Sequence, residues 1–158
     1  MKNTTLKEKL KLNQLTIGSW ITIGHPTVAE IMANAGFDWL TIDMEHNSID
    51  PSMMQTLIAI IQSKNIAALV RVPKNEEVFI KHAMDAGADG VIVPMVNTKE
   101  AAHKAVSYVK YPPQGKRGVG LSRAQNYGLG FNEYKNWLND YSIVVAQIEH
   151  KDGVANLE

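Results

Sequence analysis

Short apolar runs alternate with helical segments along almost the whole chain, and this alternation constrains the fold more than any other sequence feature. Five runs are typical of strands, because each is short, rich in apolar residues and bounded by polar residues, glycine or proline. They cover 15–23, 37–44, 66–72, 90–96 and 143–148. Strands that alternate with helices predict a parallel sheet with right-handed crossovers. The nearly continuous apolar character of the runs indicates strands that are buried on both faces.

The segments between the strands predict helices that begin at capping residues. Asp50 precedes Pro51, the order expected for an N-cap followed by proline at the first helical position. Asn75 is expected to cap the helix of the next unit, and Gly36 has the position of a C-cap. The predicted helices cover 5–12, 25–35, 50–64, 75–87, 98–109 and 133–138, with the opening turn of another at 153–158. The glycine- and proline-rich segment 111–130 is expected to be a long irregular loop.

Two architectures accommodate five consecutive strand–helix units in one domain spanning residues 1–158. One is an open, doubly wound sheet, and the other is part of a (β/α)8 barrel. A complete barrel takes about 250 residues. Because this chain has 158 residues, length alone favours the open sheet.

The charge balance and the absence of cysteine exclude several classes of function. The chain carries 16 basic and 16 acidic side chains, so we expect no nucleic-acid partner and no membrane-surface partner. Without cysteine there are no disulfides and no thiolate metal sites. The first residues lack the apolar core of a signal peptide, and no run approaches the roughly 18 apolar residues of a membrane span. We therefore expect a soluble, cytoplasmic protein.

Polar and charged residues gather where the predicted strands end, which is where sites lie in parallel α/β folds. For any one of them, the ordinary explanation is a strand that runs into a polar loop. The candidates at these ends are Asp43, Glu45, His46, Arg71, Pro94, Asn97, Gln147, Glu149 and His150.

Arg71 is the most informative of these residues, because it lies inside the otherwise apolar run 67–72. A buried guanidinium needs an anionic partner, which could be a carboxylate of a neighbouring strand or a ligand. The guanidinium fork matches the two oxygens of a planar carboxylate. Carboxylates that converge beside it suggest a hard-cation site next to an anion clamp. The alternative is a buried ion pair of Arg71 with Glu149 or Asp43.

Other residues have simpler interpretations. The histidines at positions 25, 82, 103 and 150 are expected to be surface or capping residues, and the methionines are expected to fill the core. Trp20 and Trp39 lie on predicted strands and are expected to be packed.

Five ordered segments carry a resemblance to a known family. They are AGFDWLTIDMEH at 35–46, VRVP at 70–73, DAGADGVIVPMVNTKEA at 85–101, YPPQGKRG at 111–118 and AQIE at 146–149. Together they resemble the HpcH/HpaI family of class II, metal-dependent aldolases, which act on 2-oxo acids and have a (β/α)8 barrel. The resemblance begins near residue 5 and implies that the chain forms the first five units of such a barrel. This expectation replaces the open sheet that length favours.

The resemblance implies three residues that act on the substrate. Arg71 matches the arginine that holds the pyruvate oxygens and stabilises the enolate. His46 matches the histidine that transfers protons, and Asp85 matches its acidic partner. Such roles agree with the chemistry, because a guanidinium can neutralise charge where it develops and an imidazole can move a proton near neutral pH.

The resemblance also implies a divalent cation, Mg, Mn or Co, as cofactor. Glu149 matches the first protein carboxylate on that cation, Asp43 matches an acid near the metal-bound waters, and Gln147 lines the same pocket. The second metal carboxylate of the family follows the fifth strand, beyond the residues present here. We therefore expect a fragment whose missing half supplies further strands and ligands, or a homo-oligomer.

The implied reaction is cleavage of a 4-hydroxy-2-oxo acid to pyruvate and an aldehyde. The expected substrates are of the type of 4-hydroxy-2-oxoheptanedioate or 2-dehydro-3-deoxyglucarate. Two alternatives remain open. One is a citrate-lyase-beta-like lyase that acts on an acyl-CoA ester, and the other is an inactive truncated barrel that acts only as an assembly partner.

Overall fold

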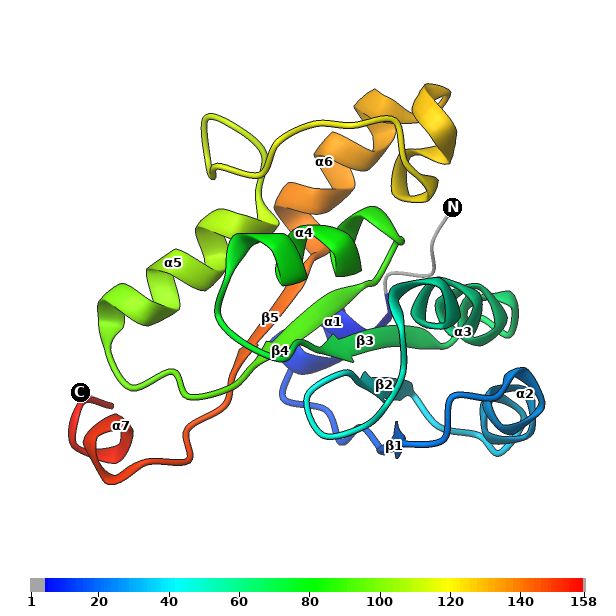
Figure 1. The fold of residues 1–158 in the computed structure, drawn as a ribbon, viewed down its shortest axis with the longest axis horizontal. Helices are drawn as coiled ribbons and strands as arrows, with labels where there is room; N and C mark the ends of the chain where they lie inside the picture. The colour runs from blue at the N-terminus through cyan, green and yellow to red at the C-terminus, as the bar shows by residue number, and fades with distance from the viewer. Residues whose placement is uncertain (1–4, 158) are drawn as a thin grey trace.

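The strands form one parallel sheet in which each strand lies beside the next one in the sequence. A computed structural model describes residues 5–157, and its sheet order is β1-β2-β3-β4-β5 (Figure 1). All four strand pairs are parallel. The strands are β1 (Gly18–Ile21), β2 (Trp39–Asp43), β3 (Ala67–Arg71), β4 (Gly90–Val93) and β5 (Ile143–Ala146).

The consecutive order distinguishes between the two architectures that the sequence allows. A doubly wound sheet reverses its strand order at a switch point, so that helices cover both faces. In this chain the order never reverses, and helices α2 to α6 lie along one side of an arc of strands (Figure 1). The open doubly wound sheet is therefore wrong, and the five units have the order of a β/α barrel. Chain length favoured the wrong architecture because it carries no information about the order of the strands in the sheet.

Seven α-helices and one 3-10 helix are found in residues 5–157. They are α1 (Thr5–Lys11), α2 (Pro26–Ala33), α3 (Pro51–Ser63), α4 (Glu77–Asp85), α5 (Lys99–Val109), η1 (Arg123–Gly128), α6 (Phe131–Tyr141) and α7 (Lys151–Ala155). The crossover from β4 to β5 is the longest, because it contains α5, η1 and α6.

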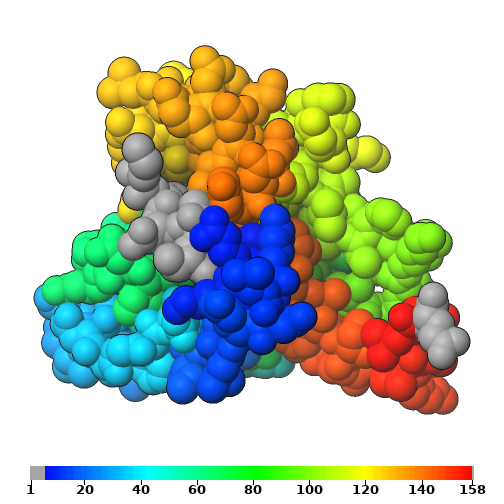
Figure 2. Space-filling model, turned by 180° about the vertical axis from the view of Figure 1, so that it is seen from behind, coloured from blue at the N-terminus to red at the C-terminus, as the bar shows by residue number. Residues whose placement is uncertain are grey.

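The main core lies between the sheet and helices α2 to α6. Alternate strand residues such as Ile21, Leu40 and Ile42 point into it and are fully buried. A small second cluster lies on the other face of the sheet, where Leu6 of α1 packs against Leu69 and Ile143. Figure 2 shows the N-terminal segment, in blue, over the middle of this face. Helix α1 thus covers one end of this second face, which is the inner face of the arc. The residues that surround the carboxyl ends of the strands come from other segments.

Several local predictions differ from the structure. Asn75 does not cap α4: Glu76 is the N-cap residue, and the Asn75 amide instead donates to the Ala101 carbonyl oxygen at 2.9 Å. Helix α2 ends at Ala33, and Gly36 adopts φ 85° in the turn that follows. Helix α6 is longer than predicted, and all five strands are shorter. Among residues 5–157, no helix has both the length and the apolar character needed to span a membrane.

Candidate functional site

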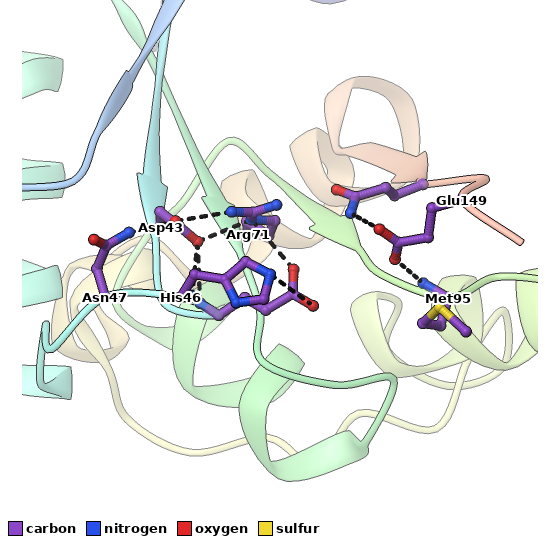
Figure 3. Close-up of polar contacts among 8 residues, drawn as sticks. Asp43, His46, Asn47, Arg71, Met95 and Glu149 are labelled. Atoms are coloured by element: carbon purple, nitrogen blue, oxygen red, sulfur yellow. Dashed lines mark hydrogen bonds and ion pairs between the residues drawn. The ribbon is translucent and has the colours of Figure 1, made fainter.

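The register between β2 and β3 places Asp43 directly beside Arg71 at the carboxyl ends of their strands. Two parallel hydrogen bonds join the side chains: Nε of Arg71 donates to Oδ1 of Asp43, and Nη2 donates to Oδ2, each at 2.8 Å (Figure 3). This bidentate geometry is the strong form of an arginine–carboxylate pair. The pair satisfies the need for an anionic partner that a guanidinium in an apolar strand creates.

Asp43 also organises the loop that follows β2. Its Oδ1 accepts the backbone N–H groups of Glu45 at 3.1 Å and His46 at 3.4 Å, and its Oδ2 accepts the Asn47 amide. Burial alone would raise the pKa of Asp43, but the hydrogen bonds from Arg71 and from the backbone of Glu45 hold that pKa below its usual range. Asp43 is therefore a buried anion that links the arginine to the loop carrying His46.

Arg71 is held on three sides. Its guanidinium carbon lies 4.6 Å from the centre of the Trp20 ring, and its Nε lies 3.3 Å from Oε2 of Glu45. The Asp43 hydrogen bond and the nearby carboxylates raise the pKa of Arg71, so the group stays charged. Asp43 occupies the edge formed by Nε and Nη2, whereas Nη1 makes no hydrogen bond within the described residues. The end of the guanidinium, between Nη1 and Nη2, is the edge that remains for a ligand.

Glu149 lies after β5 at the same edge of the sheet (Figure 3). Its Oε1 accepts the backbone N–H of Met95 at 2.8 Å, and its Oε2 accepts the Gln147 amide at 2.7 Å. The Gln147 hydrogen bond, followed by the Met95 hydrogen bond, lowers the pKa of Glu149. Electrostatic attraction to Arg71 and His46 acts in the same direction. Glu149 is thus an ionised, accessible carboxylate that faces the arginine without touching it.

His46 and Asp85, which the family resemblance pairs, are not brought together within one chain. The His46 side chain is 70% exposed, and its Nε2 lies 3.8 Å from Oε1 of Glu45. Asp85 is the last residue of α4, a helix that runs antiparallel to the strands and so ends near their amino ends. Its Oδ1 lies 3.7 Å from Nε of Arg117. The nearest carboxylate to His46 in the described residues is therefore Glu45.

The described residues do not complete a metal site by themselves. No group of three or more histidine, cysteine, aspartate or glutamate side chains within residues 5–157 is placed to hold an ion. Glu149 offers one carboxylate, and Gln147 offers an amide beside it. Divalent cations such as Mg²⁺ and Ca²⁺ take about six or more oxygen ligands. Most of such a shell would have to come from water, substrate or protein outside these residues.

Three site residues were missed or misinterpreted from the sequence. Trp20 was predicted to be packed, but the residue is 39% exposed and its ring lies against Arg71. Glu45 was expected only as one of the carboxylates that converge near Arg71, and Asn47 was not noted at all. The pattern of an aspartate followed by polar residues at a strand end could have indicated the turn that Asp43 closes, because aspartate side chains often accept backbone N–H groups a few residues on.

A parallel β/α sheet in consecutive order, with a guanidinium and carboxylates at the carboxyl ends of its strands, is the arrangement of a β/α-barrel fold with a polar site at the usual edge. Residues 16–158 match the family model described as HpcH/HpaI aldolase/citrate lyase. The chain therefore belongs to the HpcH/HpaI aldolase/citrate lyase family.

Two curated relatives and one solved structure illustrate the similarity. A 4-hydroxy-2-oxovalerate aldolase from Novosphingobium aromaticivorans is 39% identical over 155 residues, which are 98% of this chain and 59% of the relative. A 5-keto-4-deoxy-D-glucarate aldolase from Escherichia coli is 37% identical over 152 residues, which are 96% of this chain and 59% of the relative. The chain thus spans about three fifths of the curated relatives it matches.

The structural comparison agrees with the sequence comparison. The crystal structure of an HpcH/HpaI aldolase/citrate lyase family protein from Burkholderia cenocepacia J2315 superposes with a TM-score of 0.89 at 32% identity. The match covers 98% of this chain and 63% of that structure. The five β/α units described here therefore have the arrangement found in that family member.

Proposed function

We propose that the protein carrying this chain is a divalent-metal-dependent aldolase that cleaves a 4-hydroxy-2-oxo acid to pyruvate and an aldehyde. Substrates of the type of 4-hydroxy-2-oxoheptanedioate or 2-dehydro-3-deoxyglucarate suit this proposal. One observation carries it: Arg71 is fixed by Asp43 along one edge and keeps its other edge for an anion, at the carboxyl ends of the strands. A 2-oxo acid offers a carboxylate and a neighbouring carbonyl oxygen, both of which a guanidinium can bind.

The cleavage step breaks the bond between C3 and C4 of the substrate. A base removes the proton of the C4 hydroxyl, the electrons of that O–H bond form the aldehyde carbonyl, and the electrons of the C3–C4 bond become those of the pyruvate enolate. A proton then adds to C3 and gives pyruvate. Negative charge thus develops on the oxygen of the former 2-oxo group, where a fixed cation has its greatest effect.

In this proposal Arg71 binds the oxygens of the 2-oxo acid and stabilises the enolate. His46 exchanges the proton of the hydroxyl, because its side chain is accessible at the same edge and an imidazole can both accept and donate a proton. Asp43 sets the orientation of Arg71, and Gln147 lines the pocket beside Glu149. Asp85 is left out of this set, because one chain does not bring it to His46.

Glu149 is the residue that we propose as a ligand of the divalent cation, Mg, Mn or Co. Its carboxylate is ionised and accessible at this edge, as a metal ligand must be. Because the described residues do not complete the site, we assign the cation no step of the reaction.

We also propose that the protein assembles as a homo-oligomer. Three strongly exposed apolar side chains in or near η1 support this proposal: Leu121, Tyr127 and Leu129.

Arg71→Lys tests the proposed function. Lysine keeps the positive charge but loses the planar fork, so it cannot bond to Asp43 on one edge and to a substrate on the other. We expect pyruvate release from the two substrates named above, measured with Mn²⁺ present, to fall by about 100-fold or more in kcat/KM.

Arg123→Lys is the matched control. Arg123 bonds to Gln62 and to the Ala86 carbonyl oxygen, at the amino end of β4 and away from Asp43. This variant should retain the activity of the unmodified protein. A folded Arg71→Lys protein with undiminished pyruvate release would rule out the role given to Arg71.

A further inference from the structure

Two side chains, those of Arg71 and Asn47, bond to the carboxylate of Asp43. Only Arg71 belongs to the site proposed above. Arg71 bonds to both oxygens from β3. Asn47, from the loop after β2, donates its amide to Oδ2. In Figure 3 the side chains of Asn47 and Arg71 lie on opposite sides of Asp43. Any movement of this carboxylate therefore moves the guanidinium with it.

We propose that Asn47 is a positioning residue for Arg71 and acts through Asp43. The two backbone N–H groups of residues 45 and 46 hold Oδ1, so Asn47 is the loop group that holds Oδ2. With both oxygens held, the carboxylate cannot rotate about its Cβ–Cγ bond. Its plane then matches the plane of the guanidinium, as bidentate pairing requires.

The geometry explains why the position of Arg71 depends on this contact. Trp20 restrains the guanidinium through a ring face, which fixes its distance but allows it to slide. Glu45 approaches Nε at 3.3 Å, but its Oε2 is buried with no hydrogen bond of its own among the described residues. Among the described residues, the Asp43 carboxylate is therefore the only hydrogen-bond acceptor that fixes the orientation of the guanidinium, and Asn47 holds one of its two oxygens.

Asn47→Ala and Asn47→Asp test the proposal in the protein that carries this chain. The alanine variant removes the amide, and the aspartate variant keeps its shape but replaces the donor with an acceptor. The first readout is hydrogen exchange of the arginine Nε–H groups by NMR. The chain has three arginines, Arg71, Arg117 and Arg123, so the Arg71 signal can be assigned from its loss in Arg71→Lys.

We expect both variants to speed exchange of the Arg71 Nε–H by about fivefold or more, roughly the effect of one typical intramolecular hydrogen bond. The signals of Arg117 and Arg123 should not change. The second readout, which depends on the proposed function, is the dissociation constant of pyruvate measured with Mn²⁺ present. It should rise by a similar factor while the Tm changes little.

Ser48→Ala is the control, because Ser48 is an exposed neighbour in the same loop. It should leave both readouts unchanged. Unaltered exchange of the Arg71 Nε–H in a folded Asn47 variant would overturn the positioning role. If the unmodified protein binds no pyruvate, the proposed function fails, and the exchange rates still decide the role of Asn47.

Discussion

At the scale of single residues, the chain stabilises two arginines in different ways. Arg71, at the site, is partly buried, and Arg117, in the long loop, is fully buried. Arg71 has a carboxylate in bidentate contact. Arg117 is fully buried, stacks on Tyr111 at 4.2 Å and donates to the Tyr134 hydroxyl at 2.9 Å. Its Nε and Nη1 have no hydrogen-bond partner among the described residues. Aromatic rings and a hydroxyl thus make the close contacts with the Arg117 guanidinium, where Arg71 has a bidentate carboxylate.

Burial and the neighbouring Arg117 both shift the pKa of the Asp85 carboxyl group. It lies 3.7 Å from Arg117, near enough for attraction, but its Oδ1 is buried without a hydrogen bond in the described part of the chain. Burial raises the pKa of Asp85, and the attraction of Arg117 offsets that effect only in part. A carboxyl group whose pKa is raised by folding makes the folded state less stable once it is ionised.

Asp85→Asn is therefore expected to raise the stability of the protein at pH 7. The folded state holds the Asp85 proton more tightly than the unfolded chain does. Stability consequently falls as pH rises from about 4, the ordinary aspartate value, through the raised pKa. The variant lacks this loss, so its advantage in Tm should appear over that window and vanish below it. Thermal unfolding of both proteins between pH 3.5 and 8 measures the difference, and a lower Tm for Asp85→Asn at pH 7 would contradict the prediction.

At the scale of elements, the unit from β2 to α3 connects the site to the core. Asp43 closes the turn after β2, and Asp50 begins α3 by accepting the Met53 backbone N–H at 2.8 Å. Pro51 fits the first helical position, where an N–H has no partner in the helix. Two aspartates seven residues apart thus fix both ends of the loop that carries His46.

Asp50→Ala should lower the free energy of unfolding by about 1 kcal/mol, the usual cost of losing an N-cap. Asp50→Asn keeps a side-chain oxygen that accepts the same N–H, so its effect should be well under half as large. Urea unfolding of the three proteins measures both values. Equal losses for alanine and asparagine would show that the charge of Asp50, and not its capping bond, stabilises the start of α3.

The elements also show which features were predictable from the sequence. The cap at Asp50 was predicted correctly because the signal and its partner lie within four residues of each other. Asn75 looked equally suitable, but its amide bonds to Ala101 in the following helix. That contact depends on how α4 and α5 pack, and no local pattern contains it.

The site shows the same limit. An anionic partner for Arg71 could be predicted from burial alone, with Asp43 and Glu149 as the choices. Only the register, which pairs Asp43 with Arg71 across two strands, decides for Asp43. The contact with Trp20 was not predictable either, because it joins β1 to β3 across the intervening strand. Sequence patterns identified the charged residues, and tertiary structure determined their partners.

At the scale of the whole molecule, the described chain is an arc with two free edges. Within residues 5–157, β1 pairs only with β2, and β5 pairs only with β4. The inner face of the arc is covered mainly at its amino end, by Leu6 and its neighbours, whereas Trp20 and Val145 remain partly exposed. Free edges of this kind can pair with further strands. The relatives, of which the chain spans about three fifths, contain additional sequence beyond the matched part.

Amide hydrogen exchange on this 158-residue chain should therefore show a gradient across the sheet. We expect the slowest exchange in β2, β3 and β4, whose N–H groups lie between two strands. Exchange in β1 and β5 should be at least about tenfold faster, because fraying of an edge strand costs less free energy than global unfolding. The internal control is β3, the central strand, measured in the same sample. Protection of β1 and β5 equal to that of β3 would contradict the open arc and would show that strands of a second copy pair with both edges. Loss of that protection on dilution would then confirm the second copy, because pairing between chains depends on concentration whereas pairing within a chain does not.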